Sequence, residues 1–289
     1  PYCSAYLSYE LGIHAPGKKH RALALQAAHH LLLAHGLAME VLAQNSPNAL
    51  NGVVLNLSPC HSATARAEDV QAADYADQYF NQWYLQPILE GQYPALMQQI
   101  PEQDRPTIQD GDLAIIAQPL DYLGVNYYTR GVYFRENDEW FTAVEPRYVP
   151  LTDMGWEIYP QGLQEVLLNI HQRYSLPPIY ITENGAALPE EWQPQQVLDH
   201  ARIDYLDQHL SALDTAMKQG VDVRGYFAWS LMDNFEWAEG YLKRFGLVHV
   251  DFETQKRTLK SSALAWRHML QRRRAANGLT DKSPIENRG

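Results

Sequence analysis

Four short runs of β-branched and aromatic residues, each followed by a helical pattern, constrain the fold of this chain most. The runs span residues 53–58, 121–128, 179–182 and 223–230. The helical patterns that follow them span residues 68–86, 162–174, 199–219 and 261–270, and another over 21–44 precedes the first run. Strands that alternate with helices predict a parallel α/β architecture. Eight such units would form a (β/α)8 barrel, and the sequence contains four.

The connecting segments are polar or rich in turn residues. Residues 1–19 are expected to form a loop, and residues 132–149 either a loop or a hairpin. A polar loop is expected over 189–196. The helix over 68–86 is expected to be broken up by Pro87, Gly91 and Pro94. We therefore expect one domain over residues 1–271 and a disordered polar tail over 272–289.

Composition narrows the class of protein. Of the 289 residues, 46% are hydrophobic, and the net charge is −11. Such an acidic balance argues against nucleic acid or an anionic membrane as partner. No apolar run approaches about 20 residues, which argues against a membrane span. Two cysteines and no visible signal peptide favour a cytoplasmic location, although the chain opens on Pro1.

No cofactor or metal site is expected. The sequence contains neither a Gly-x-Gly-x-x-Gly motif nor a Walker loop, so nucleotide binding is unsupported. His29, His30 and His35 lie in one predicted helix. A metal site would need them on one face with further ligands from elsewhere, so helix-surface or packed histidines are the preferred interpretation.

Glu183 is the first candidate for chemistry. The run Ile179–Thr182 ends at Glu183, and Asn184-Gly185 marks a turn directly after it. In parallel α/β sheets and barrels, ligands bind at the carboxyl ends of the strands. A carboxylate at this place can face a reacting substrate or be a solvated loop residue, and its position alone leaves both open.

Two motifs resemble those of one enzyme family. Residues 181–185 (Ile-Thr-Glu-Asn-Gly) resemble the nucleophile motif of the family 1 glycoside hydrolases, the β-glucosidase family. Residues 226–237 (Tyr-Phe-Ala-Trp-Ser-Leu-Met-Asp-Asn-Phe-Glu-Trp), with Gly240-Tyr241 and residues 243–247, resemble the family's sugar-binding segment. The resemblance extends from Pro1 to about Trp266 and implies a (β/α)8 barrel that cleaves β-glycosides with retention, with Glu183 as nucleophile.

The resemblance also implies that part of the barrel is missing. In the family, a Thr-Phe-Asn-Glu-Pro motif at the end of the fourth strand carries the general acid/base. Pro1-Tyr2-Cys3 is similar to the residues that follow that glutamate. The chain is therefore expected to supply strands five to eight. An N-terminal half, in the same parent chain or a separate one, is expected to supply the acid/base and further sugar ligands.

The remaining site residues follow from the same resemblance. Tyr128 matches the tyrosine that hydrogen-bonds the nucleophile, and Asn126 lines the same site. Glu236 matches a glutamate that accepts hydrogen bonds from sugar hydroxyls. The aromatic matches are Trp229, Trp237 and Phe245 around the sugar, and Trp156 on the aglycone side. His14 and Asn56 are weaker candidates for the aglycone side, and Lys243 and Arg244 are interpreted as structural. For Tyr128 and Asn126, the alternative is a polar residue that caps the end of a strand. For the tryptophans, the alternative is packing in the core.

The substrate is expected to be a neutral β-glucoside or oligosaccharide. Family members that act on 6-phosphorylated sugars carry a serine and lysine pattern in place of Phe235-Glu236-Trp237. Glu236 would repel a phosphate at short range. A glucose-like glycone is expected first, then a fucose- or galactose-like one. The alternative function is a non-catalytic half-barrel, which would bind sugar or serve as a structural subunit.

Overall fold

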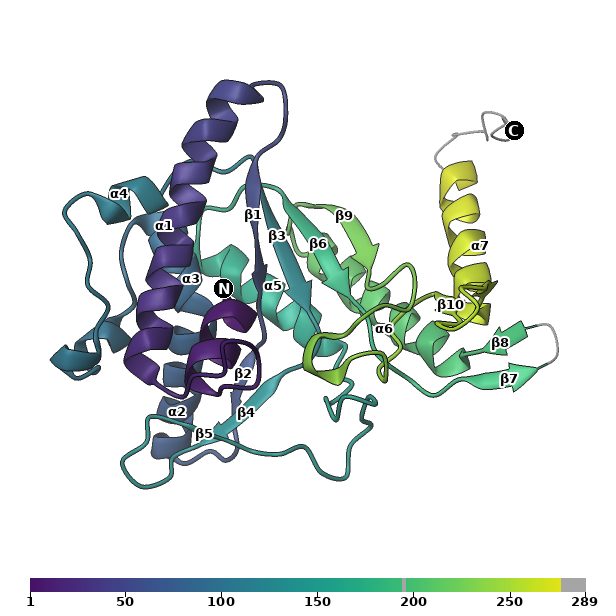
Figure 1. Ribbon diagram of the computed structural model, residues 1–289, viewed down its shortest axis with the longest axis horizontal. Helices are drawn as coiled ribbons and strands as arrows, with labels where there is room; N and C mark the ends of the chain where they lie inside the picture. Colours follow the sequence, from purple (N-terminus) through teal and green to yellow (C-terminus); the bar gives the residue numbers. More distant parts are fainter. Residues whose placement is uncertain (194–195, 277–289) are drawn as a thin grey trace.

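A parallel sheet of four strands organises the molecule (Figure 1). The computed structural model describes residues 1–193 and 196–276. The strands are β1 (Gly52–Asn56), β3 (Tyr122–Tyr127), β6 (Ile179–Asn184) and β9 (Val223–Ala228), hydrogen-bonded in that order. Each falls within one of the four predicted runs or within two residues of its ends. The predicted α/β architecture is therefore confirmed for these elements.

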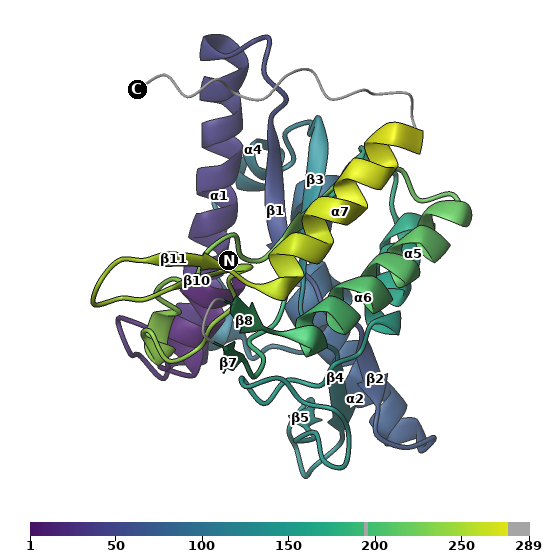
Figure 2. The ribbon, with the colours of Figure 1, turned by 90° about the vertical axis from the view of Figure 1, so that its right-hand side faces the viewer.

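Helices flank the sheet at the predicted places. The longer ones are α1 (Arg21–Asn45), α2 (Ala67–Asp77), α3 (Trp83–Glu90), α5 (Gln161–Arg173), α6 (His200–Lys218) and α7 (Ser261–Ala276). Figure 2 shows α6 lying between α5 and α7. The short helical segments are α4 (Asp112–Ile116), η3 (Ala95–Gln98), η4 (Glu102–Asp104) and η5 (Trp237–Glu239).

Three expectations about local structure need correction. Residues Tyr2–Glu10 form a π-helix (η1) rather than a loop. A second π-helix (η2, Gln78–Gln82) separates α2 from α3, and Pro87 lies inside α3 instead of ending it. The helix ends at Gly91, which has the left-handed conformation and is one of the three predicted breaks.

Short strands also form within the connecting segments. Residues 131–143 form the hairpin that was one of two alternatives, and β2 joins it in a small sheet. Two further hairpins lie in segments that were expected to be loops or were left unassigned. The strands are β2 (Cys60–Ser62), β4 (Gly131–Phe134), β5 (Thr142–Ala143), β7 (Glu191–Gln193), β8 (Gln196–Leu198), β10 (Val248–Val250) and β11 (Arg257–Leu259).

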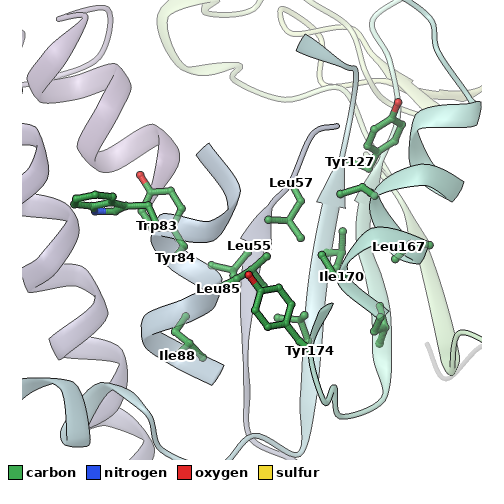
Figure 3. Packing of buried hydrophobic residues seen from close by; sticks show 14 of the residues in the cluster. Leu55, Leu57, Trp83, Tyr84, Leu85, Ile88, Tyr127, Leu167, Ile170 and Tyr174 are labelled. Carbon is green, nitrogen blue, oxygen red and sulfur yellow. The ribbon is translucent and has the colours of Figure 1, made fainter. Parts of the chain in front are cut away.

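The main core lies between one face of the sheet and the helices (Figure 3). Alternate strand residues such as Leu55, Val125 and Ile181 are fully buried there. They pack against side chains of α3 and α5, including Leu85 and Leu167. Each such side chain contributes roughly 1.5–3 kcal/mol to folding.

The opposite face of the sheet is open. Val54 on β1 is 39% exposed and Phe227 on β9 is 57% exposed. On β3, a Cβ added to Gly124 would lie 2.7 Å from Val54 Cγ2 and 2.9 Å from Thr182 Cγ2, so these residues share that face. Val54, Gly124 and Thr182 are thus close-packed on this face, and Val54 and Phe227 leave apolar surface in contact with solvent, which monomeric proteins limit.

Helix α1 has two apolar faces. Leu25, Ala28 and Leu32 are buried in the core, whereas Leu37 and Val41 on the other side are exposed. By length and mean hydropathy (1.2), α1 also meets the criterion for a membrane span, which the sequence reading did not anticipate. Core helices meet the same criterion, so the expectation of no membrane partner stays a prediction.

The C-terminal helix is longer than expected. Helix α7 continues through Ala276, so residues 272–276 of the expected tail are helical. Residues 277–289 lie outside the described part of the chain.

Candidate active site

Three polar residues lie side by side at the carboxyl end of the sheet. Asn56 on β1 pairs with Asn126 on β3, and Asn126 pairs with Glu183 on β6. A register shift after Val125 sets this alignment. Thr182 Oγ1 donates a hydrogen bond of 2.6 Å to Asn126 Oδ1. The parallel sheet therefore brings residues far apart in sequence to one ligand-binding edge.

Tyr128 and Glu183 are in direct contact. Tyr128 follows β3, and its hydroxyl donates a hydrogen bond of 2.5 Å to Glu183 Oε2. Burial, and then the Glu183 carboxylate, raise the pKa of Tyr128 well above its usual range. The phenol therefore stays protonated and acts as a donor to a charged oxygen, the stronger kind of hydrogen bond.

Asn184 fixes the end of the Glu183 strand. The sequence indicates only a turn at Asn184-Gly185, but the Asn184 side chain is fully buried. Its Nδ2 donates to Tyr127 O at 2.9 Å and to Tyr205 Oη at 3.1 Å. Tyr226 Oη donates to Asn184 Oδ1 at 2.6 Å. The side chain thus links β3, β9 and α6 directly behind Glu183.

Gly185 allows a close approach of two segments. A Cβ at this position would lie 1.7 Å from the carbonyl oxygen of Trp229. The Trp229 N–H donates to Asn184 O at 2.9 Å. The turn after Glu183 and the start of the segment after β9 therefore lie against each other with no room for a side chain.

Three aromatic rings form a wall beside Glu183. The Tyr128 ring lies 5.4 Å from that of Trp156 and 6.4 Å from that of Phe245, between centroids. Trp156 and Phe245 are 6.2 Å apart. Phe245 is buried and Trp156 is partly buried. The structure therefore brings these three predicted residues together at Glu183.

Glu236 is near enough to Glu183 for the two carboxylates to interact electrostatically, whereas Trp237 is largely exposed. Burial, and then the carboxylates of Glu183 and Glu239, raise the pKa of Glu236 above its ordinary 4.5. Trp237 is 64% exposed and stacks on His14, with ring centroids 5.9 Å apart. The Trp229–Ser230 peptide bond is cis.

Cys3 is a site neighbour that the sequence reading did not single out. Burial, and then the carboxylates of Glu183 and Glu236, raise the pKa of the Cys3 thiol. The thiol is free and partly buried. Cys3 enters the sequence analysis only as part of Pro1-Tyr2-Cys3, and no local pattern marks its proximity to two carboxylates that are far away in sequence.

A buried ionic cluster lies beneath the segment after β9. Asp233 Oδ2 accepts from Arg244 Nη1 at 2.7 Å, and Asp233 Oδ1 accepts from Lys260 Nζ at 2.9 Å. Lys260 also donates to Glu190. Arg244 is thus structural in its contacts, as expected.

The described residues contain one group with metal-ligand spacing, Glu190, Asp233 and His249, and it lies in this cluster. Lys260 and Arg244 already donate to its carboxylates. Of the helix histidines, His29 contacts Asp112 and Tyr93, and His30 contacts Gln26. Neither place therefore carries a metal proposal.

A cavity of about 630 Å³ lies away from the Glu183 edge. It is lined by side chains of α2, η2 and α5, among them Asp77, Glu165 and Arg173. None of the predicted site residues lines it. The carboxyl edge itself is open, as expected when one face of the sheet is uncovered.

Comparison with known proteins identifies the family. The model of Glycosyl hydrolase family 1 matches residues 1–275. A β-glucosidase of Agrobacterium sp. is 43% identical over 91% of this chain and 58% of its own length. A 6-phospho-β-galactosidase of Streptococcus pneumoniae is 39% identical over 83% of this chain and 58% of its own length.

Comparison with solved structures points to the same family. The GH1 β-glucosidase of Exiguobacterium antarcticum B7 is similar with a TM-score of 0.89 and 39% identity, over 96% of this chain and 63% of that protein. A parallel α/β sheet with a carboxylate at its carboxyl edge fits a family of (β/α)8 barrels. The chain belongs to glycosyl hydrolase family 1. It spans less than two thirds of the length of these relatives.

Proposed function

We propose that this chain carries the nucleophile and the sugar-binding wall of a retaining β-glucosidase. The contact between Tyr128 and Glu183 supports this most directly, because it holds a carboxylate in place at the carboxyl edge of a parallel sheet. Glu183 would attack the anomeric carbon as the bond to the leaving oxygen breaks, forming a glycosyl-enzyme. Water then attacks the same carbon and releases the sugar and the free Glu183 carboxylate.

The reaction needs a second carboxyl group. It protonates the leaving oxygen and later takes a proton from water, and it stands about 5–5.5 Å from the nucleophile in retaining enzymes. We assign this role to an N-terminal half of the barrel rather than to Glu236. The four parallel strands would then be strands five to eight. The open, apolar face at Val54 and Phe227 and the partial coverage of relatives support this assignment.

The other residues would bind substrate. Glu236 would accept hydrogen bonds from sugar hydroxyls, and Trp229 and Trp237 would pack against sugar C–H groups and donate from their indole N–H. Phe245 would close the same subsite, and Trp156 would face the aglycone. Asn126 would line the site next to Glu183. The ring contacts of Tyr128, Trp156 and Phe245 support a continuous wall.

A neutral, glucose-like glycone fits this site best. Relatives include both a β-glucosidase and a 6-phospho-β-galactosidase, so family membership leaves the glycone open. The chemistry of Glu236 favours the neutral sugar, because a second carboxylate near Glu183 would repel a phosphate. A plain β-glucoside should therefore be cleaved faster than its 6-phosphate. The opposite order would exclude this glycone.

The test of the nucleophile uses the chain assembled with the N-terminal half. Incubation with a 2-fluoro glucosyl inactivator should add one sugar to the peptide that contains Glu183, seen by mass spectrometry. Glu183→Gln should abolish both labelling and turnover, by several orders of magnitude in kcat. Full turnover by Glu183→Gln would exclude the assignment. An unlabelled, inactive wild type would favour the non-catalytic half-barrel.

A further inference from the structure

We propose that Asp233 is a positioning residue that fixes the sugar-binding segment from Trp229 to Phe245. The inference rests on the proposed function in assigning sugar contacts to Trp229, Glu236 and Trp237. Asp233 itself is fully buried and would not touch the sugar. It lies four residues after Trp229 and three before Glu236.

The segment is a loop whose two arms pair beneath the site. Ser230 N donates to Phe245 O at 3.2 Å, and Leu247 N donates to Ser230 O at 2.9 Å. Asp233 N donates to Val248 O at 3.0 Å. Trp229 begins the outgoing arm, and Phe245 lies at the start of the returning arm. Between the arms, the tip carries Glu236 and Trp237.

The Asp233 carboxylate joins the outgoing arm to the returning arm. Its Oδ1 accepts from Gly246 N at 2.9 Å and from Lys260 Nζ at 2.9 Å. Its Oδ2 accepts from Arg244 Nη1 at 2.7 Å and from Val250 N at 3.3 Å. Two donors are backbone groups of the returning arm, and Arg244 lies on that arm too. One side chain therefore sets the spacing of the loop.

The two arms are tightly packed where Asp233 meets Gly246. A Cβ at Gly246 would lie 2.1 Å from Asp233 N, so the arms are in backbone contact. An asparagine at position 233 would keep one acceptor oxygen. Its amide NH2 would face donors in place of the other oxygen. Asp233→Asn is therefore the smallest change that breaks the junction.

The charge at Asp233 is held by the surrounding cluster. Burial alone would raise the pKa of Asp233, but Lys260 and Arg244, with a backbone N–H, outweigh it and lower the pKa. The nearby His249 and Glu190 also face this group. The carboxylate therefore remains ionised and keeps both oxygens as acceptors.

The same cluster reaches the Glu183 side of the site. Arg202 on α6 is buried and ion-paired with Asp199 at 2.9 Å. Its guanidinium donates to Ala186 O, three residues after Glu183, and to Phe245 O at 3.3 Å. The exit of β6 and the returning arm are thus joined through one residue. A shift at Asp233 should accordingly move sugar contacts relative to Glu183.

The first test measures the ¹⁹F signals of the tryptophans, which report their surroundings directly, in the full chain. We would label it with 5-fluorotryptophan and assign the ¹⁹F signals of Trp229, Trp237 and the core residue Trp83. Asp233→Asn should shift or broaden the Trp229 and Trp237 signals and leave Trp83 in place. Unchanged Trp229 and Trp237 signals would overturn the proposal.

The matched control is Asp69→Asn. Asp69 is also fully buried and accepts from Arg66 Nη2 at 2.9 Å and Arg135 N at 3.1 Å, but its contacts lie around α2 and β4. It should leave the Trp229 and Trp237 signals unchanged, and an equal effect from both variants would overturn the proposal. If Asp233→Asn does not fold, Arg244→Gln removes one donor to the same carboxylate and should move the same two signals.

A double-mutant cycle in the assembled enzyme supplies the second test. Asp233→Asn should lower kcat/KM for a β-glucoside by about tenfold or more. The part of this loss that acts through Glu236 should vanish in a Glu236→Ala background, so the two losses should be less than additive. Additive losses would indicate general destabilisation and overturn the proposal. The ¹⁹F result does not depend on activity, so an inactive wild type would count against the proposed function alone.

Discussion

The carbonyl oxygen of Trp229 occupies the place where a side chain on Gly185 would begin. The distance from a Cβ built on Gly185 to this oxygen is 1.7 Å. The turn after Glu183 and the start of the sugar-binding segment are therefore held against each other by direct backbone contact. Small changes at this contact should affect both stability and catalysis.

Gly185→Ala should destabilise the protein by about 1–3 kcal/mol, the usual cost of overpacking, because a backbone oxygen cannot move aside easily. The melting temperature measures this loss. Gly155→Ala is the matched control. Gly155 has φ +76° but no atom within 4 Å of its Cβ position, so only backbone strain is added. A Gly185→Ala protein as stable as the wild type would contradict the close contact.

Tyr128→Phe should lower kcat on an aryl β-glucoside by about 100-fold in the assembled enzyme. The variant removes the hydroxyl that donates to Glu183 Oε2 but keeps the ring contacts with Trp156 and Phe245. KM should change much less, since the aromatic wall persists. The exposed Tyr148→Phe should have no effect. A normal kcat for Tyr128→Phe would show that the contact does not serve the reaction.

Glu236→Gln should become more stable than the wild type as the pH rises. The raised pKa of Glu236 means that above its ordinary 4.5 the folded protein still holds a proton that the unfolded chain has lost. This stabilising contribution is present at low pH and is lost as the pH rises through the raised pKa. Melting temperatures from about pH 4 to about pH 8 would reveal the divergence. The exposed Glu253→Gln is the control, and parallel curves for Glu236→Gln would refute the prediction.

His209 should make the fold sensitive to mild acid. Burial lowers its pKa from 6.5 to about 4, and its ring stacks on Tyr205 at 3.9 Å. As the pH falls from 6.5 to about 4, His209 binds a proton in the unfolded chain but not in the folded protein, so stability declines in this pH range. His209→Phe should flatten this decline, as measured by thermal unfolding. Tyr205 accepts a hydrogen bond from Asn184, the residue after Glu183. If the wild type loses activity over the same pH range, protonation of His209 also affects the Glu183 site.

Local sequence patterns predict the strands well but not how their ends are fixed. The runs at 53–58 and 179–182 have strand-forming residues bounded by turns, so their pairing follows from the alternation with helices. Asn184 shows the limit. Its turn is readable from sequence, while its side-chain partners Tyr205 and Tyr226 come from other elements.

The ionic cluster shows the same limit more strongly. Lys260 meets Asp233 and Glu190, which are 27 and 70 residues away in sequence, and no spacing rule relates such partners. The contact between Tyr128 and Glu183 is predictable only from the resemblance of these motifs to a known family. Pro87 lies inside α3 rather than breaking the helix, and the π-helix η2 before α3 has no simple sequence signal.

The open face of the sheet has a thermodynamic consequence. Val54, Phe227 and the outer side of α1 hold apolar surface in water. Covering that surface with the remaining strands should give a large negative heat-capacity change, the most robust marker of apolar burial on association. Calorimetric titration at several temperatures would then show an enthalpy of assembly that becomes steadily more favourable on warming. The completed barrel should consequently associate less tightly in the cold, where the hydrophobic driving force weakens.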